Sequence, residues 1–401
     1  MSKPMDNSDS QLPIHFEDTS IAFQHKSDRD LQLSYLIFLL TKRPFLVKFL
    51  SRAAKLSLSM GLPVKPLIKA TVFRQFCGGE TRREYQKVIA QLGRSGIGAI
   101  LDYSVEGGGD EAGFEETKNA ILQTIRQAGS DKNIPCACMK MTGIVAESLL
   151  EKMTAGGALS KEDEPAWECL KQRLSDICKQ AEEGGTPIYI DAEESWIQGI
   201  IDDLAEEMML IFNQKKAIVF TTLQMYRTDR VDYFKRLIEN ARRNAFLLGV
   251  KIVRGAYMEQ ERERARHWGH PSPIYPDKPA TDRSFDEILR LFMDHIDVVE
   301  ICVGTHNETS CKLLADFMAE RGIPNDHPHV YFSQLYGMSD HISYKLADAG
   351  YNVTKYLPFG PVASTLPYLA RRAEENTAIA GQMSKELEII VRERQRRRAA
   401  G

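Results

Sequence analysis

Eight short apolar runs, rich in β-branched residues, alternate with longer amphipathic segments along most of this chain. The runs are Gly96–Tyr103, Ile134–Met141, Pro187–Asp191, Ala217–Gln224, Val250–Val253, Val298–Val303, His329–Gln334 and Asn352–Leu357. The amphipathic segments include Phe114–Gln127, Trp196–Asn213, Arg230–Leu247, Glu308–Arg321 and Ser364–Ala378. Strand-like runs with helix-like connections are typical of a parallel sheet covered by helices. Eight near-regular units favour a closed (β/α)8 barrel over the competing open, doubly wound sheet.

The residues before the first run have a different pattern. Residues 1–20 indicate a loosely docked arm, and Asp28–Met60 has a helical pattern with a break expected at Arg43-Pro44. We therefore predict an N-terminal helical arm over residues 1–70 and a barrel domain over residues 71–401. The helical segment is apolar with scattered lysines and arginines, so it either packs on the neighbouring domain or lies on a membrane surface.

Charge and composition exclude several classes of protein. The 52 lysines and arginines nearly balance the 55 aspartates and glutamates, giving a net charge of −3, so nucleic acid is not an expected partner. No metal-site signature and no nucleophile elbow occur, and Gly107–Ala112 resembles a phosphate loop but carries two acidic residues where a pyrophosphate would lie. We therefore predict no metal site and no Rossmann-type nucleotide turn.

Cysteine usage and the N-terminus bear on location. Seven cysteines form no C-x-x-C pair, and Cys136 and Cys138 flank one residue on a predicted strand, where both would be packed thiols. The N-terminus shows no signal or transit pattern, and the longest apolar stretch, Leu31–Leu40, is too short to span a bilayer. These features predict a cytoplasmic protein, either free or resting on the inner face of the membrane.

Polar residues close each of the eight runs. They are Asp102, Lys140, Asp191, Gln224, Arg254, Thr305-His306, Gln334 and Lys355-Tyr356. Barrel enzymes build their active sites from the C-terminal ends of the strands. One such residue is as readily a loop cap as a functional group, but eight together favour a shared functional rim. Lys140 and Asp191 end successive strands and are expected to form a buried ion pair, which offers a partner to each charge of a zwitterionic ligand.

Two further groups lie near these strand ends. Arg371-Arg372 follows the last run on a helix-like segment, where the guanidinium groups either bind a carboxylate or pair with Glu374 and Glu375 on a solvated helix face. Tyr257, Tyr336 and Tyr356 lie at or just past strand ends, where they form either a wall for a small ligand or a cap on the barrel core.

Nine segments, in order from about residue 71 to residue 382, resemble the proline dehydrogenase family. They are ATVFRQFCGGET, LDYSVE, MKMTG, IDAEE, TLQMY, KIVRGAYMEQERERA, THNE, VYFSQLYGM and KYLPFGPV with LPYLARRAEEN. The likeness is to the monofunctional, eukaryotic-type enzyme. It implies a distorted (β/α)8 barrel that binds FAD without a covalent link, oxidises L-proline to Δ1-pyrroline-5-carboxylate and passes electrons to a membrane quinone.

The resemblance also implies roles for individual residues. Asp191 and Lys251 match catalytic positions. Positions that contact the substrate are matched by Lys140, Tyr257, Leu335, Tyr356, Arg371, Arg372 and Glu375. Positions that contact the flavin are matched by Ala192, Gln224, Arg254, Gly255, Ala256, Thr305 and His306. Lys251 departs from the arginine of many bacterial relatives; it keeps a positive charge that would stabilise reduced anionic flavin but lacks the planar fork.

Three alternatives remain open from the sequence. The first is a 4-hydroxyproline dehydrogenase on the same fold, although relatives that prefer hydroxyproline carry a smaller residue at the position of Tyr356. The second is a barrel without catalytic activity that acts as a scaffold. The third is a barrel lyase or aldolase that uses Lys140 to form a Schiff base.

Overall fold

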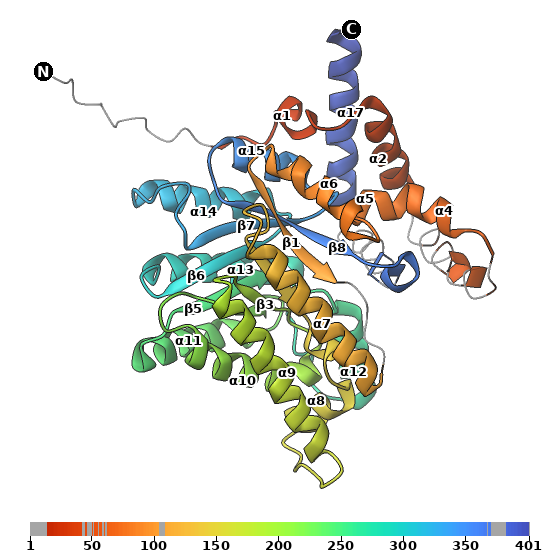
Figure 1. Ribbon diagram of the computed structural model, residues 1–401. Coiled ribbons are helices and arrows are strands. Elements are labelled where there is room, and N and C mark those ends of the chain that lie inside the picture. The colour runs from red at the N-terminus through yellow and green to blue at the C-terminus, as the bar shows by residue number, and fades with distance from the viewer. Residues whose placement is uncertain are drawn as a thin grey trace, which may run out of the picture.

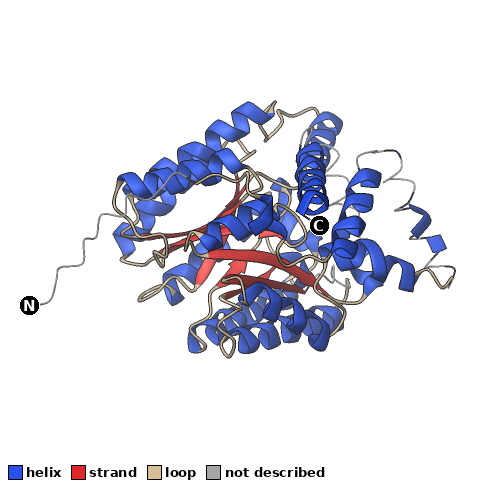
Figure 2. Cartoon of the chain, turned by 90° about the horizontal axis from the view of Figure 1, so that it is seen from above, coloured by secondary structure: helices blue, strands red, loops and turns tan. Residues whose placement is uncertain are grey.

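Eight parallel strands close into a barrel in the order in which they occur in the chain (Figures 1 and 2). The computed structural model describes residues 14–41, 45, 50, 52–54, 56–57, 60, 62–103, 109–366, 368–369 and 382–400. The strands are β1 Ile97–Tyr103, β2 Cys136–Met139, β3 Ile188–Ile190, β4 Val219–Gln224, β5 Leu248–Val253, β6 Val299–Gly304, β7 Val330–Leu335 and β8 Val353–Phe359. The predicted (β/α)8 barrel is confirmed.

The barrel closes where β1 pairs with β8. This pairing runs from Ile97 opposite Val353 to Tyr103 opposite Phe359, so the open sheet that competed with the barrel is wrong. Strand bounds agree with the predicted runs within about two residues. The run predicted to end at Met141 ends as a strand at Met139, because Met141–Gly143 forms a 3-10 turn.

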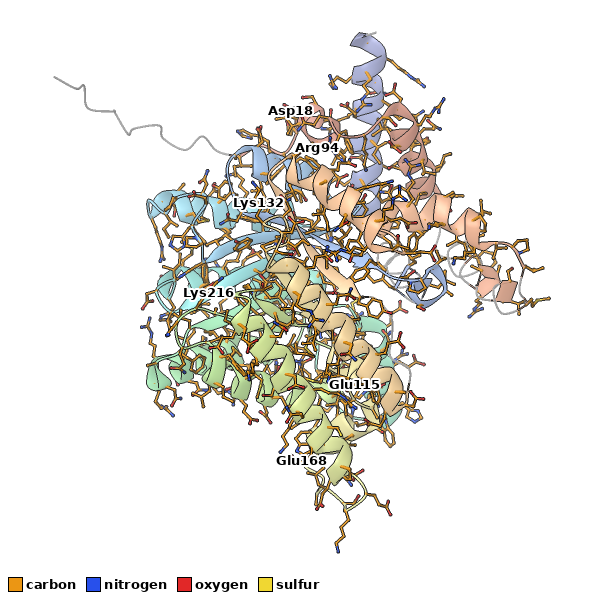
Figure 3. The ribbon with its side chains drawn as sticks, in the orientation of Figure 1. Asp18, Arg94, Glu115, Lys132, Glu168 and Lys216 are labelled. Carbon is orange, nitrogen blue, oxygen red and sulfur yellow. The ribbon has the colours of Figure 1, made fainter. Side chains whose placement is uncertain are left out.

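Side chains alternate between the inside of the barrel and the helices outside it, as the period of a strand requires. The inside contains Ile100, Cys136, Cys138, Tyr189, Ala217, Phe220 and Cys302. Cys136 and Cys138 thus share one face of β2, as predicted, and all seven cysteines are free thiols, of which only Cys169 is exposed. In Figure 3, Lys132 and Lys216 lie at the end of the barrel where β2 and β4 begin, and Glu115, on the helix after β1, lies toward the opposite end.

Helices cover the outside of the barrel and bury a large apolar core against it. They are α6 Arg82–Gly93, α7 Glu111–Ala128, α8 Glu147–Thr154, α9 Glu164–Glu183, α10 Ser195–Phe212, α11 Arg230–Asn244, α12 Met258–Trp268, α13 Lys278–Asp294, α14 Glu308–Glu320 and α15 Asp340–Asp348. Side-chain N-caps define where several of these helices begin. Asn307 accepts from the backbone N–H groups of Thr309 and Ser310, and Asp110 accepts from that of Gly113.

Helices from both ends of the chain form a layer on the side of the barrel near β7 and β8 (Figure 1). This terminal helical layer consists of α1 Thr19–Phe23, α2 Asp28–Thr41, α4 Lys65–Ile68, the π-helix Lys69–Phe73, α5 Arg74–Phe76 and α17 Gln382–Ala400. Its apolar cluster includes Phe23, Phe38, Phe73, Phe76 and Ile390. The predicted helix Asp28–Met60 is confirmed as far as Thr41, and its expected break at Arg43-Pro44 lies outside the described residues.

The terminal helical layer also has an exposed apolar surface. Among the described residues from 36 to 67, nine large hydrophobic side chains are exposed: Leu36, Leu39, Leu40, Phe45, Leu50, Leu56, Met60, Leu62 and Leu67. The expectation that the N-terminal segment packs on the neighbouring domain is met by one of its faces, and contact with a membrane stays a prediction. Within the described part of the chain, no helix is long and apolar enough to cross a membrane.

Candidate active site

A carboxylate, an ammonium group and a phenol meet inside the C-terminal end of the barrel. Asp191, which follows β3, forms an ion pair through Oδ1 with the Lys251 ammonium of β5. Its Oδ2 accepts a hydrogen bond of 2.9 Å from the Tyr356 hydroxyl of β8. Lys251 Nζ also lies 5.3 Å from the centre of the Tyr356 ring, close enough for a cation–π contact.

Strand register explains why these residues meet. Ile190 pairs with Thr221, so Asp191 continues level with Thr222, and Thr222 pairs with Lys251. Asp191 and Lys251 are therefore in register with each other across the intervening strand β4. Inward side chains of a (β/α)8 barrel pack in layers contributed by alternate strands. The register thus places both charged side chains inside the barrel on either side of β4, where they form their ion pair.

Asp191, Lys251 and Tyr356 are buried, so the charge state of each depends on its neighbours in the cluster. Asp191 is 9% exposed and Lys251 is 5% exposed. Burial by itself would discharge the lysine, but the Asp191 carboxylate raises the pKa of Lys251 above its ordinary value. Burial also raises the pKa of Tyr356 well above its usual range, so its hydroxyl keeps the proton that it donates to Asp191.

The expected ion pair between Lys140 and Asp191 is wrong. Both residues belong to the described part of the chain, and Asp191 pairs with Lys251 instead. Lys140 stands after the last residue of β2, where the chain turns into the 3-10 helix, and its half-buried side chain lines a cavity of about 400 Å³. Tyr257 and Tyr368 line the same cavity, as do Glu193 and Glu194.

Glu193 and Glu194 were missed as site residues, although the IDAEE motif places three acidic residues within four positions after β3. Glu193 accepts from the backbone N–H and hydroxyl of Thr142, and burial raises its pKa. Burial raises the pKa of Glu194 to about 7, and the neighbouring Glu193 carboxylate adds to the shift. Both acids lie near Lys140, whose charge opposes these shifts.

The residues matched to flavin contacts lie together along the ends of β4, β5 and β6. Gln224 accepts at 3.1 Å from the backbone N–H of Ala256, and its amide donates to the Glu193 carbonyl at 2.7 Å. The Gly255 φ of +135° brings the backbone against the Tyr226 ring, where any Cβ would lie 2.5 Å from a ring carbon. Only glycine fits at position 255, because its φ is positive and a side chain there would overlap the Tyr226 ring.

Arg254 joins the ends of β5 and β6. Its guanidinium pairs with Asp282 at 2.7 Å, donates to the Thr305 hydroxyl at 2.6 Å and lies 4.3 Å from the centre of the Phe285 ring. The imidazole Nδ1 of His306, the next residue after Thr305, lies 2.9 Å from the Ser339 hydroxyl. This row contains an amide, a guanidinium group, a hydroxyl and an imidazole at adjacent strand ends.

The remaining predicted positions have mixed outcomes. Ala192 and Leu335 are partly buried next to strand ends, and Leu335 packs against the apolar cluster of the terminal helical layer. Lys355 does not belong to the rim, because it lies on the outer face of β8, fully buried and 2.9 Å from Asp340. Arg371, Arg372 and Glu375 lie outside the described residues, as does most of the predicted helix Ser364–Ala378.

The closed barrel and the acid–lysine–tyrosine cluster at its C-terminal end define a (β/α)8-barrel enzyme. A sequence model of the family described as proline dehydrogenase matches residues 85–385. The chain belongs to the proline dehydrogenase family and is an oxidoreductase of that family. Family membership excludes the scaffold alternative.

Two named relatives and one solved structure show how far the likeness extends. Proline dehydrogenase 1, mitochondrial, of Dictyostelium discoideum is 32% identical, over 95% of this chain and 74% of that protein. Hydroxyproline dehydrogenase of Xenopus laevis is 30% identical, over 96% of this chain and 91% of that protein. Proline utilization A of Bdellovibrio bacteriovorus matches in fold with a TM-score of 0.71 at 19% identity, over 92% of this chain and 39% of that one.

Proposed function

We propose that this protein oxidises L-proline to Δ1-pyrroline-5-carboxylate with FAD and passes the electrons to a membrane quinone. The observation that carries the proposal is the buried group of Asp191, Lys251 and Tyr356 at the C-terminal end of a barrel of this family. The product, the cofactor and the acceptor are parts of the proposal.

The row of residues at the ends of β4, β5 and β6 fits FAD. Gln224 and the Arg254–Ala256 turn offer amide donors and acceptors suited to the edge of a flavin ring. The Arg254 guanidinium offers fixed donors to a pyrophosphate, and Thr305 and His306 offer partners for hydroxyl groups. The hydrogen bonds that link these side chains keep them in place before a cofactor arrives. When bound, FAD supplies the acceptor for the hydride that leaves the substrate.

The substrate would be oriented by the residues facing it. Arg371 and Arg372 would bind the proline carboxylate, with Glu375 pairing to them, and Tyr257, Leu335 and Tyr356 would pack on the ring. Lys140 has no ion pair with Asp191 in the described structure, so its charge at the cavity would repel a protonated amine and favour the neutral form that can release hydride. Holding the substrate in the orientation needed for reaction supplies a large share of an enzyme's rate acceleration.

The visible spectrum of the purified protein, recorded without oxygen before and after L-proline is added, tests the proposal. We expect a flavin band that bleaches on addition of proline. A flavin band that does not bleach after L-proline is added would show that L-proline is not the substrate. Failure to bind flavin after FAD is supplied would contradict the cofactor. Because the lyase alternative uses Lys140, trapping with borohydride and a carbonyl compound is the matching test for it.

An Asp191→Ala variant tests the catalytic role of the buried group. We expect a loss of turnover of at least a hundredfold, because Lys251 and Tyr356 lose the carboxylate that positions both. Tyr356→Phe, which removes one hydrogen bond and leaves the ion pair, is the milder comparison. Full turnover in Asp191→Ala would remove Asp191 from the mechanism.

Hydroxyproline is the second candidate substrate, because the Xenopus laevis hydroxyproline dehydrogenase is similar over nearly all of this chain. Tyr356 favours proline, since its ring and its bond to Asp191 fill space at the substrate wall. We expect Tyr356→Ser to raise the ratio of hydroxyproline to proline turnover by roughly tenfold, the scale of one pocket contact. A wild-type enzyme that prefers hydroxyproline would reverse the assignment.

The quinone acceptor requires access to a membrane. The exposed apolar side chains between residues 36 and 67 lie on α2, on α4 and on the segment between them, and α4 and α5 lie toward the end of the barrel where β1 ends (Figure 1). This arrangement supports peripheral contact with the cytoplasmic face of a membrane on the side of the active site. The free cysteines suit a reducing compartment.

A further inference from the structure

A second cavity lies at the N-terminal end of the barrel, opposite the proposed active site. Its volume is about 370 Å³, a size typical of small-molecule sites. Its lining residues lie at or just before the starts of β2 to β7, and Lys216 marks this end of the barrel in Figure 3. In the described structure, this N-terminal cavity shares no lining residue with the cavity of Lys140.

Three aromatic side chains give the N-terminal cavity an apolar wall. Tyr189 of β3 and Phe220 of β4 belong to the cluster inside the barrel, and Tyr331 of β7 packs against that cluster. The ring centres of Tyr189 and Phe220 lie 4.7 Å apart. On its other side, Tyr189 lies 5.9 Å from the Lys251 ammonium, measured from the ring centre. Tyr189 therefore contacts both this cavity and the proposed catalytic group.

Glu300 brings a carboxylate to the same cavity. It is the second residue of β6, is 9% exposed, and faces the barrel interior like Cys302 two residues later. Its Oε1 accepts from the backbone N–H of Ala217 at 3.3 Å and lies 3.9 Å from Nε2 of His329. None of the described residues donates a hydrogen bond to Oε2. Burial raises the pKa of Glu300, because these contacts replace only part of its lost hydration.

Two lysines bring positive charge to the cavity. Lys215 and Lys216 are exposed and precede β4, and Lys216 donates to the Gly185 carbonyl at 3.0 Å. The charge of Lys216 favours the ionised form of Glu300, so the two groups are close enough to interact. Within the described part of the chain, however, neither lysine forms an ion pair with Glu300, whose nearest cationic partner is His329. The cavity thus contains opposite charges that are not paired with each other.

We propose that the N-terminal cavity binds an α-amino acid with an aromatic or branched apolar side chain. The ammonium group of the ligand would lie at Glu300, its carboxylate at Lys215 and Lys216, and its side chain against the aromatic wall. A ligand with only one charge would leave either the carboxylate or the lysines of the cavity without a partner. The inference goes beyond the proposed function, because it uses neither FAD nor a residue of the proposed active site.

Three probe molecules separate the two charges of the ligand. L-Phenylalanine carries both charges, phenethylamine lacks the carboxylate, and 3-phenylpropanoate lacks the ammonium group. Isothermal titration calorimetry of the purified protein with FAD supplied should show saturable binding of L-phenylalanine with a Kd of about 1 mM or lower. The Kd should be about tenfold higher for each of the other two probes, the scale of one hydrogen bond to a charged group.

Two variants assign the charges to residues. Glu300→Gln keeps an acceptor for the Ala217 N–H, and it should raise the Kd of L-phenylalanine and phenethylamine about tenfold without weakening 3-phenylpropanoate. Lys215→Gln combined with Lys216→Gln should weaken L-phenylalanine and 3-phenylpropanoate instead. Because each variant keeps its affinity for one probe, a general loss of folding cannot produce this pattern. Lys140→Gln, at the other cavity, is the matched control and should leave all three Kd values unchanged.

Several outcomes would overturn the inference. The first is the absence of saturable L-phenylalanine binding to the wild type. The second is weaker binding in Lys140→Gln but not in Glu300→Gln, which would place the ligand in the proposed active site. Equal Kd values for the three probes would show that the charges of the cavity do not select the ligand. The flavin spectrum with L-proline tests the proposed function separately, so the two can fail independently.

Discussion

Lys251 stays charged inside the barrel because Asp191 lies against it, whereas burial shifts Glu194 toward its neutral form although Lys140 lies near it. The two residues show the two outcomes of placing a charge at a buried position: a close partner of opposite charge, or a shifted pKa. Both lie close to the space proposed for the substrate. At the scale of single residues, the site therefore combines one fixed charge pair with one acid that titrates near neutral pH.

Glu194 gives a prediction about pH. Its pKa is 4.5 ordinarily and about 7 in the folded protein, so the folded state holds an extra proton between these values. The free energy of unfolding should therefore fall as the pH rises from about 4.5 through 7, by roughly 2–3 kcal/mol from this group. In Glu194→Gln that decline should be smaller by the same amount.

Urea unfolding of the wild type and the variant at pH 5, 6, 7 and 8 measures this difference. Asp203→Asn, which removes one carboxylate at an exposed position on α10, serves as the control. Parallel curves for the wild type and Glu194→Gln would show that Glu194 ionises normally in the folded protein.

Single residues also show what the sequence can and cannot predict. Asp191 was found because it closes a strand, and Tyr356 because it closes another. Their hydrogen bond and the pairing of Lys251 could not be read from the pattern, because alternation tells which face a residue occupies and not which strands share a layer. The expected pair of Lys140 and Asp191 failed for this reason, since neighbouring strand ends looked nearer than alternate ones.

At the scale of elements, the turn from β7 to α15 is clamped from several directions. Asp340, at the start of α15, lies 2.9 Å from both Lys355 of β8 and Lys26, which precedes α2. Gln75 of α5 donates to the Gly337 carbonyl at 2.7 Å, and a Cβ on Gly337 would lie 1.9 Å from the Gln75 carbonyl oxygen. The turn that carries Ser339 and follows Leu335 therefore depends on the terminal helical layer for its shape.

Asp340→Asn tests this clamp. Burial opposes the Asp340 charge, but Lys26 and Lys355 hold its pKa well below the usual range, so its contribution is present at neutral pH and is lost only in strong acid. The variant leaves the ammonium of Lys355 buried without a carboxylate. We expect a loss of about 3–5 kcal/mol in the free energy of unfolding between pH 5 and 8.

The control for this prediction is Asp30→Asn, which breaks the exposed pair with Arg74 in the same layer. We expect that variant to lose less than about 1 kcal/mol, as exposed ion pairs do. Denaturant unfolding provides both values. Similar losses in the two variants would show that the buried cluster does not stabilise the attachment of the layer.

The strands were predicted more completely than the helices. The eight strands were visible because their runs are apolar on both faces, as expected for a covered parallel sheet. The helix α12 was not among the predicted segments, because Met258–Trp268 is mainly charged and has few apolar residues to mark a face. The two connections that contain two helices, α8 with α9 and α12 with α13, have no counterpart among the amphipathic segments named from the sequence.

At the scale of the whole molecule, the exposed apolar side chains are concentrated in the terminal helical layer. Some of the arginines in the basic run Arg392–Arg398 already form ion pairs within the protein. Glu393 pairs with Arg396 and Arg397, and Arg397 also pairs with Asp28. The apolar surface rather than the basic run is therefore the better guide to membrane contact.

Vesicle sedimentation with anionic phospholipid tests this contact. We expect Leu39→Ser combined with Leu40→Ser to weaken binding at least tenfold, because each buried leucine contributes about 1.5 kcal/mol or more. Leu210→Ser is the control, since Leu210 is 45% exposed on α10 and Leu40 is 48% exposed on α2. Equal vesicle binding by the double variant and the wild type would exclude this surface as the contact.

The contact of α17 with α1 and α2 has a consequence for biosynthesis. These helices are more than three hundred residues apart in the chain, so α17 leaves the ribosome only after all eight strands. A nascent chain can therefore close its sheet while the β7–α15 turn still lacks Glu386 and the apolar cover provided by Ile389 and Ile390. The β7–α15 turn, and His306 beside it, should therefore be the last part of the catalytic end to reach its final structure, because α17 is synthesised after all eight strands.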